Sequence, residues 1–205
     1  METIVYLMRH SKTVKVNYLI NNDSLLIQNQ KSILSCEGEE IAKKHSMLPE
    51  LQKIDLVISS NYVRAISTAK YIAQRNNIEI NIIDDFGERI HGVNSYSELP
   101  KDFEKMQFND EDFKVGYGES QIEVRNRMYD ALKKVIHNNC GKNILITSHS
   151  TAISFLLKKW CDVEYGGPIK YNKKIIFDGD WSFGCETFRL VFDSNDNLLS
   201  IKFIQ

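Results

Sequence analysis

The 205-residue chain lacks the features that mark several large classes of protein. No apolar run approaches the roughly 18 residues of a membrane span, and residues 1–3 lead into an early strand rather than a signal peptide. The four cysteines are widely spaced and form no Cys-x-x-Cys pair, which favours reduced thiols over a disulfide framework or a zinc site. We therefore expect a cytoplasmic protein that does not enter a membrane.

An excess of charge is also lacking. Lys and Arg total 26 against 27 Asp and Glu, so no global field points to nucleic acid or to an anionic membrane, and any anion site must be local. Apolar residues at 42% and charged residues at 26% are typical of a globular protein with a full core. The length predicts a single domain over residues 1–205, and we find no internal repeat or low-complexity tract.

Hydrophobic patterning predicts strands that alternate with helices. Buried strands are expected at 4–8, 54–59 and 143–147, and a half-exposed strand at 78–82. Helices are expected at 35–47, 62–75, 120–139 (opened by a Ser-x-x-Glu capping box) and 150–160. A closing hairpin is expected at 186–192 and 198–204. Residues 14–34 are polar with a turn signal at 21–24, residues 86–118 are expected to be irregular and partly helical, and residues 162–182 are loop-rich. This order predicts a three-layer α/β/α sandwich around a mostly parallel sheet.

Three of these strands end in polar residues of one kind. Arg9 and His10 follow the first strand, Arg64 opens the helix after Ser59-Ser60, and His149 follows Ser148. Ligands bind beyond the carboxyl ends of strands in such sheets, and a helix N-terminus favours an anion. A lone histidine is usually structural, but two histidines and two arginines at neighbouring strand ends predict a phosphate site. His45 and His137 fall on amphipathic helices, where a surface position is expected.

Six ordered motifs carry a resemblance to a known family. They are Leu7-Met8-Arg9-His10, Leu34-Ser35-Cys36-Glu37-Gly38, the Ser-Ser-x-x-x-Arg-Ala-x-x-Thr-Ala stretch from Ser59 to Ala69, Phe86-Gly87-Glu88-Arg89, Gly118-Glu119-Ser120 and Ser148-His149. Their order is similar to that of the histidine phosphatase superfamily, with its phosphoglycerate mutase-like fold, over nearly the whole chain. The stretch around Arg64 is the most specific of the six.

The resemblance implies a role for several of these motif residues. His10 becomes the phosphate acceptor, Arg9, Arg64 and His149 form the phosphate pocket, and Glu88 donates a proton to the leaving group. The implied activity is hydrolysis of a phosphomonoester through a phosphohistidine, with no metal and no cofactor. These side chains suit the roles, because a neutral imidazole is nucleophilic near neutral pH and arginines bind phosphoryl oxygens as fixed cations.

The chain also departs from the family pattern around the nucleophile. Ser11 and Ser150 stand where the family usually has glycine, so each adds volume and a hydroxyl close to the phosphate. Lys12 replaces a Glu or Gln, and Val16 replaces a pocket asparagine, with Asn17 one place late. Ser11, Asn17 and Ser150 are therefore candidates for additional pocket residues.

The residues that follow the proposed nucleophile help to distinguish a phosphatase from a mutase. The glycolytic mutases carry a Gly-Trp-x-Asp segment after their nucleophile that is missing here, which favours a phosphatase and keeps mutase-type phosphoryl transfer as the alternative. Segments 14–34 and 89–118 are the expected rim of the active site and should set selectivity. The expected substrate is a phosphorylated small molecule or a phosphoprotein.

Other chemistries fit the sequence less well. A cysteine phosphatase needs arginine six residues after its cysteine, and the four such positions hold Ala42, Ile146, Gly167 and Val191. There is no Gly-x-Ser-x-Gly elbow and no phosphate-binding loop ending in Gly-Lys-Ser/Thr. Acid–base cleavage of RNA by two histidines is disfavoured by the near-neutral charge. A phosphoprotein-binding module without catalytic activity remains an alternative, but it is disfavoured because the chain keeps all five residues to which the resemblance assigns a role: Arg9, His10, Arg64, Glu88 and His149.

Overall fold

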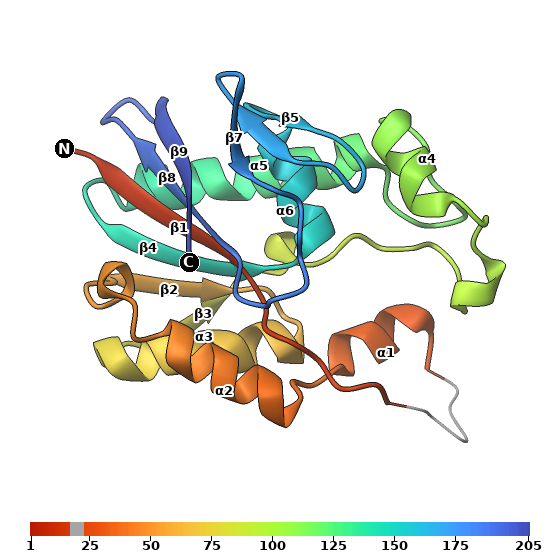
Figure 1. The fold of residues 1–205 in the computed structure, drawn as a ribbon, viewed down its shortest axis with the longest axis horizontal. Coiled ribbons are helices and arrows are strands. Elements are labelled where there is room, and N and C mark those ends of the chain that lie inside the picture. Colours follow the sequence, from red (N-terminus) through yellow and green to blue (C-terminus); the bar gives the residue numbers. More distant parts are fainter. Residues whose placement is uncertain (17–22) are drawn as a thin grey trace.

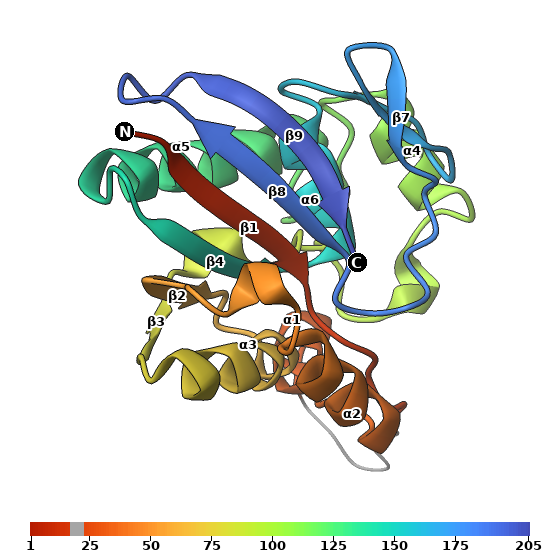
Figure 2. The same ribbon diagram turned by 60° about the vertical axis from the view of Figure 1, so that its left-hand side comes forward.

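A computed structural model describes residues 1–16 and 23–205. A six-stranded sheet runs through it in the order β3-β2-β4-β1-β8-β9. Its strands are β1 (Thr3–Arg9), β2 (Leu56–Ser59), β3 (Ile80–Ile82), β4 (Asn143–Ser148), β8 (Thr187–Phe192) and β9 (Leu198–Ile204). The first four are parallel, whereas β8 is antiparallel to β1 and pairs with β9 as the expected hairpin. Figure 2 shows β1 between β4 and β8.

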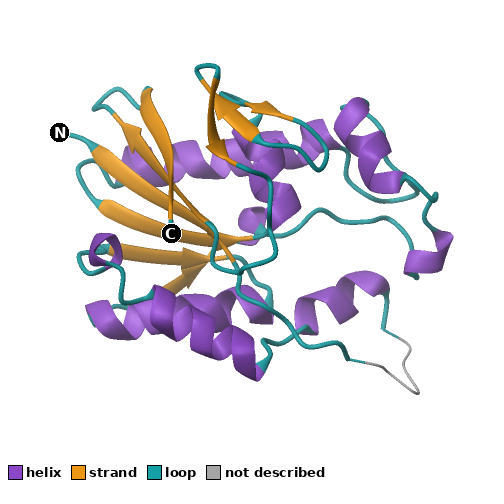
Figure 3. Cartoon of the chain, in the orientation of Figure 1, coloured by secondary structure: helices purple, strands orange, loops and turns teal. Residues whose placement is uncertain are grey.

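Helices cover both faces of this sheet, as Figures 1 and 3 show. One face carries α2 (Cys36–His45) and α3 (Val63–Asn76), and the other carries α5 (Gln121–Asn138) and α6 (Ser150–Leu157). Alternate side chains of β1 point to opposite faces of the sheet: Val5 and Leu7 pack on the side of α5 and α6, and Tyr6 and Met8 pack on the side of α2 and α3. The predicted three-layer α/β/α architecture is confirmed.

Local sequence signals account for where several elements begin. The Ser120 hydroxyl accepts from the backbone N–H of Glu123, whose carboxylate returns to the Ser120 N–H, so the capping box that opens α5 is confirmed. Ser35 caps α2 in a similar way through the N–H of Gly38, at 3.0 Å. Both helices therefore begin where the side-chain chemistry of their first turns predicts.

Two segments with turn or loop signals contain regular structure that the sequence did not predict. Within 14–34, α1 (Leu25–Lys31) forms a short helix with Leu25 as its buried residue. Within 162–182, β5 (Asp162–Val163), β6 (Ile169–Tyr171) and β7 (Lys174–Phe177) form a small antiparallel sheet, so this loop-rich segment also holds strands that the sequence did not predict. The β6–β7 turn places Asn172 and Lys173 at positive φ, a hairpin geometry that Asn-Gly signals more clearly than Asn-Lys does.

The chain between β3 and α5 is irregular and partly helical, as predicted. After η2 (Asp84–Phe86) it holds η3 (Tyr96–Glu98) and α4 (Phe103–Asn109). In Figure 1, α1 and α4 lie on the side of the molecule toward which β1, β2 and β4 point. Short turns fill the rest, including η1 (Pro49–Leu51) before β2. In the described part of the chain, none of the helices combines the length and apolar character that a bilayer span requires.

Candidate active site

His10 immediately follows β1 and is 8% exposed. Its backbone N–H donates to the Ser148 carbonyl at the end of β4, at 2.9 Å. The ring Nδ1 lies 2.7 Å from the Ser11 carbonyl oxygen. Because a carbonyl can only accept, Nδ1 carries the proton, and Nε2 keeps its lone pair. The backbone therefore selects the tautomer in which Nε2 is the nucleophilic atom.

His149 is the N-cap residue of α6 and is fully buried. Its Nδ1 lies 3.1 Å from Nη2 of Arg64, and its Nε2 lies 2.9 Å from the Ser60 hydroxyl. A guanidinium can only donate, so Nδ1 accepts and Nε2 donates its proton to Ser60. The His149 ring is 5.1 Å from the His10 ring, centroid to centroid. The structure thus places two neutral imidazoles side by side.

The surroundings keep both rings neutral. Burial lowers the pKa of His10 well below its ordinary value, and the positive charges of Arg64 and Arg9 lower it further. Burial likewise lowers the pKa of His149, followed by the charges of Arg64 and of the neighbouring rings and guanidiniums. Both rings are therefore uncharged at neutral pH, so each keeps one nitrogen lone pair, which a nucleophile or a hydrogen-bond acceptor needs.

Arg64 lies in the first turn of α3 and is 7% exposed. Besides the bond to His149, it donates through Nη1 to the Asn29 carbonyl of α1 and stacks over the Tyr62 ring, 4.7 Å from the centroid. A cation at a helix N-terminus is unfavourable unless an anion binds beside it. This arrangement therefore suits an anion held between the guanidinium and the helix terminus.

Arg9 is fixed by a buried carboxylate that the sequence did not point out. Its Nη1 donates to the Trp181 carbonyl and lies 3.2 Å from the Glu186 carboxylate, which also accepts from the Gly184 N–H at 2.7 Å. Glu186 is 1% exposed in its side chain. The ion pair orients the Arg9 guanidinium close enough to lower the pKa of His10. Part of the Arg9 guanidinium is thus occupied by the Trp181 carbonyl and the Glu186 carboxylate, whereas Arg64 donates to His149.

Glu88 lies in the irregular chain after η2, and its side chain reaches the first turn of α6, the helix that His149 precedes. Its Oε1 accepts from the backbone N–H groups of Arg89, at 2.9 Å, and Ala152, at 3.1 Å. The side chain is half-buried and contacts the backbone of Arg89 rather than its guanidinium. Glu88 therefore does not form a side-chain ion pair with Arg89, its neighbour in the sequence, which pairs with Glu104 instead.

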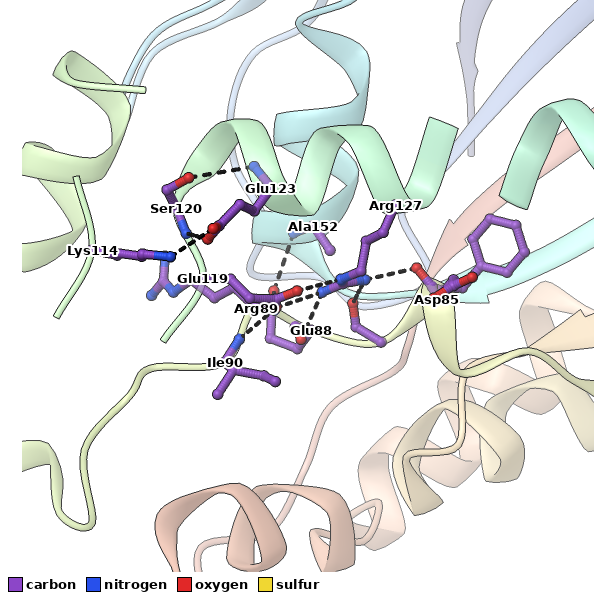
Figure 4. Close-up of polar contacts among 12 residues, drawn as sticks. Asp85, Glu88, Arg89, Ile90, Lys114, Glu119, Ser120, Glu123, Arg127 and Ala152 are labelled. Carbon is purple, nitrogen blue, oxygen red and sulfur yellow. Dashed lines mark hydrogen bonds and ion pairs between the residues drawn. The ribbon is translucent and has the colours of Figure 1, made fainter. Parts of the chain in front are cut away.

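Arg127 and Glu119 hold the segment that carries Glu88 (Figure 4). Arg127 makes a bidentate pair with the Glu119 carboxylate, at 2.6 and 2.9 Å, and donates to backbone carbonyls of the 85–88 segment. Glu119 also accepts from the Ile90 N–H at 2.9 Å. These hydrogen bonds fix the backbone on both sides of Glu88. A bidentate arginine pair fixes geometry as well as charge.

The additional pocket candidates have different surroundings. Ser11 is fully buried, and its N–H donates to the Thr68 hydroxyl at 2.9 Å, which in turn donates to the Arg64 carbonyl at 2.7 Å. The end of β1 is thereby tied to the helix that carries Arg64. Ser150 is half-buried in the first turn of α6. Asn17 lies outside the described residues.

The two predicted rim segments meet above Arg64. The Tyr96 hydroxyl of η3 donates to the Asn29 side chain of α1 at 3.0 Å, and the Asn29 carbonyl accepts from Arg64. The two segments are 67 positions apart in the chain at this contact.

In residues 1–16 and 23–205, no group of three or more His, Cys, Asp or Glu side chains is arranged to hold a metal ion.

The structure is an α/β fold in which two neutral histidines and two arginines lie near the carboxyl ends of β1, β2 and β4, with the Glu88 carboxylate at the first turn of α6. The chain belongs to the histidine phosphatase superfamily, branch 1, whose family model matches residues 5–173. The resemblance drawn from the six motifs is confirmed.

Relatives and solved structures agree with this assignment. The chain is 29% identical to a probable phosphoglycerate mutase GpmB of Escherichia fergusonii over 75% of the chain and 72% of that protein. It is 26% identical to phosphoserine phosphatase 1 of Hydrogenobacter thermophilus over 75% of the chain and 70% of that protein. A mycobacterial glucosyl-3-phosphoglycerate phosphatase shares the fold, with a TM-score of 0.70 at 14% identity, covering 100% of this chain and 97% of that one.

Proposed function

We propose that this protein is a phosphatase that hydrolyses a phosphomonoester through a phosphohistidine on His10. The observation that carries the proposal is the hydrogen bond from His10 Nδ1 to the Ser11 carbonyl, beside two arginines and a neutral His149. It leaves Nε2 with a lone pair in a pocket of positive charge. That combination suits attack on phosphorus, since attack needs an unprotonated nitrogen and a neutralised phosphoryl group.

In this mechanism, Arg9, Arg64 and His149 stabilise the phosphoryl oxygens as charge shifts between the attacking nitrogen and the leaving oxygen. His149 reaches the phosphoryl group through Nε2–H, which now donates to Ser60. Exchange of the Ser60 hydroxyl for a phosphoryl oxygen replaces a neutral acceptor with a charged one, which strengthens the bond. Oriented donors of this kind act without reorganisation when the reaction occurs.

Glu88 is the proposed acid and base. The carboxyl group gives its proton to the leaving alkoxide and then takes a proton from the water that attacks phosphohistidine. Both of its bonds to backbone N–H groups use Oε1, so Oε2 is the oxygen that serves the substrate. Arg127 and Glu119 act as positioning residues, because they hold the backbone on both sides of Glu88. Proton transfer in such a position contributes about 10²–10⁴-fold to rate.

The proposed reaction uses no metal, because the arginines supply the positive charge that a metal would supply. Turnover of p-nitrophenyl phosphate, measured with and without a strong chelator, tests both parts of the proposal. We expect inorganic phosphate to be released equally in both conditions. His10→Asn keeps an N–H for the Ser11 carbonyl but has no nucleophile and should be inactive, while His137→Asn, an exposed histidine, should be unchanged. Metal-restored activity after chelation contradicts the metal-free reaction.

Phosphoryl transfer of the mutase type is the second candidate, and the similarity to relatives named phosphoglycerate mutase favours it. A mutase returns the phosphoryl group from His10 to another hydroxyl instead of to water. Incubation with 3-phosphoglycerate separates the two, since a mutase yields 2-phosphoglycerate while a phosphatase yields glycerate and inorganic phosphate.

A further inference from the structure

A cavity of about 300 Å³ adjoins the proposed active site at the first turn of α6. Ser150 and Thr151, which follow His149 and precede Ala152, form one wall. Ala152 is the residue whose N–H holds Glu88. The cavity therefore lies next to the proposed proton donor, where the alcohol part of a phosphate ester must leave. Its volume is at the low end of ligand pockets, which suits a small leaving group.

Aromatic rings form a second part of the wall. Phe108 of α4 and Tyr165 lie 5.7 Å apart, centroid to centroid, and Trp181 joins them at the cavity. Trp181 is also the residue whose carbonyl accepts from Arg9, so this wall reaches the phosphate pocket. Aromatic faces carry negative electrostatic potential and attract ammonium groups. Lys158 already lies 5.5 Å from the Phe108 ring centroid, so Tyr165 and Trp181 are the rings that offer this contact to a ligand.

The charged side chains on the cavity wall are both acidic. They are Glu104 of α4 and Glu164, and no lysine or arginine lines the cavity in the part of the chain that the structure describes. Each carboxylate forms an ion pair: Arg89 Nη2 lies 2.7 Å from Oε1 of Glu104, and Lys170 Nζ lies 3.8 Å from Oε1 of Glu164. The Glu164 pair is loose, and its side chain is 70% exposed, so its carboxylate remains available to a cationic ligand.

We infer that this cavity receives the alcohol part of the substrate and selects a leaving group that carries an ammonium. The preferred substrates are then phosphate esters of small amino alcohols or quaternary ammonium alcohols. Esters whose alcohol part carries a second anion are disfavoured by Glu104 and Glu164. This inference rests on the proposed phosphatase function and adds the chemical class of its substrate.

Three esters of similar size test the charge preference directly. O-phosphoethanolamine carries an ammonium, propyl phosphate is neutral and phosphoglycolate carries a carboxylate. We expect kcat/KM for phosphoethanolamine to exceed that for propyl phosphate about fivefold, as one exposed ion pair and one cation–π contact allow. Phosphoglycolate should fall below propyl phosphate. Phosphocholine should match or exceed phosphoethanolamine, because its larger cation fills the aromatic wall.

Variants separate the carboxylate and ring contributions. Glu164→Gln should lower the ratio of phosphoethanolamine to propyl phosphate activity about two- to fivefold, and Glu164→Lys should favour phosphoglycolate. Tyr165→Leu should lower the same ratio with little change for propyl phosphate. Glu79→Gln, at an exposed carboxylate that does not line the cavity, is the matched control and should keep the ratio.

The outcomes distinguish the two levels of the proposal. If none of the four esters and not even p-nitrophenyl phosphate is hydrolysed, the phosphatase function fails and this inference fails with it. If the neutral esters are hydrolysed but the ammonium ester has no advantage, only the ammonium preference is overturned. That preference is also overturned if phosphoglycolate is the better substrate, or if Glu164→Gln and Glu79→Gln have equal effects on the ratio.

Discussion

Stability should fall steeply as the pH drops from 7 to 5, because several histidines are buried in their neutral form. Burial lowers the pKa of His10 and His149 well below the ordinary value, and burial lowers the pKa of His45 to about 4. An unfolded histidine titrates near pH 6.5, so below that pH the unfolded chain binds protons that the folded chain does not. The stability present at pH 7 is therefore lost as the pH falls.

The size of the effect follows from the two pKa values. For His45, a folded pKa of about 4 and an unfolded value of about 6.5 give a loss of about 1.8 kcal/mol between pH 7 and pH 5. Burial also lowers the pKa of His91 to about 4, so His45 and His91 together lose about 3.6 kcal/mol over that range, and His10 and His149 act in the same direction. A domain has only about 5–15 kcal/mol in total. The protein should therefore lose a large share of its stability by pH 5.

Carboxylates contribute little in this window. Hydrogen bonds and ion pairs lower the pKa of Glu39, Glu111 and Glu123, so their protonation destabilises the fold only at still lower pH. The loss between pH 7 and pH 5 should accordingly be assignable to histidines.

Urea unfolding at pH 7, 6 and 5 measures the loss, and one variant assigns part of it. His45→Gln retains a donor for the Thr187 hydroxyl, 3.0 Å from His45 Nε2, but takes up no proton. It should reduce the fall in unfolding free energy by about 1.8 kcal/mol. His137→Gln, at a side chain that is 78% exposed, is the control. Equal pH slopes for wild type and His45→Gln would refute this explanation.

Five substitutions at four residues test the catalytic assignments. Arg64→Met should lower kcat about 10²–10³-fold with the fold intact, whereas Arg9→Met should also cost about 3–5 kcal/mol of unfolding free energy by leaving the Glu186 carboxylate buried alone; steady-state rates and urea unfolding check both. Glu88→Gln should slow alkyl phosphates far more than p-nitrophenyl phosphate, and equal losses on both would exclude it as the acid. Arg127→Met should reproduce that leaving-group dependence more weakly, with Arg127→Lys intermediate, while a uniform loss on both esters would indicate a purely structural role.

Much of the fold and site could be predicted because the relevant signals are local. The apolar run of β1 ends abruptly at Arg9-His10, and Arg64 lies in the first turn of the helix after β2. Each motif therefore lies at a strand end that the local sequence predicts. Parallel pairing of β1 with β4 then brings His10 and His149 together. The geometry within the site follows from sheet topology rather than from any one motif.

The missed features depend on contacts between distant residues. Glu186 pairs with Arg9 across 177 positions, and Arg127 reaches Glu88 across 39, so no local pattern marks either contact. A charged residue at the start of the predicted strand 186–192 was the available hint for Glu186. His45 was expected at the surface of its helix; it is half-buried, because the neighbouring β8 lies against it and supplies Thr187 as its partner.

The short elements were missed for a related reason. The helix α1 is seven residues long, and its sequence has little apolar periodicity, so its position depends on contacts of Asn29 with Arg64 and Tyr96. The strands β5, β6 and β7 have two to four residues each, too few for alternation to be visible.

A covalent phosphoryl group on His10 is the central claim, and rapid quenching tests it most directly. The activated leaving group of p-nitrophenyl phosphate makes hydrolysis of the intermediate the slower step, so a burst of nitrophenolate should accompany accumulation of labelled enzyme. With radiolabelled phosphate ester and an alkaline quench, we expect an alkali-stable, acid-labile label on the peptide that contains His10. His149→Ala should form it slowly, and His10→Asn should form none. A label on Ser11, or turnover that persists in His10→Asn, would contradict the assignment of His10 as the nucleophile.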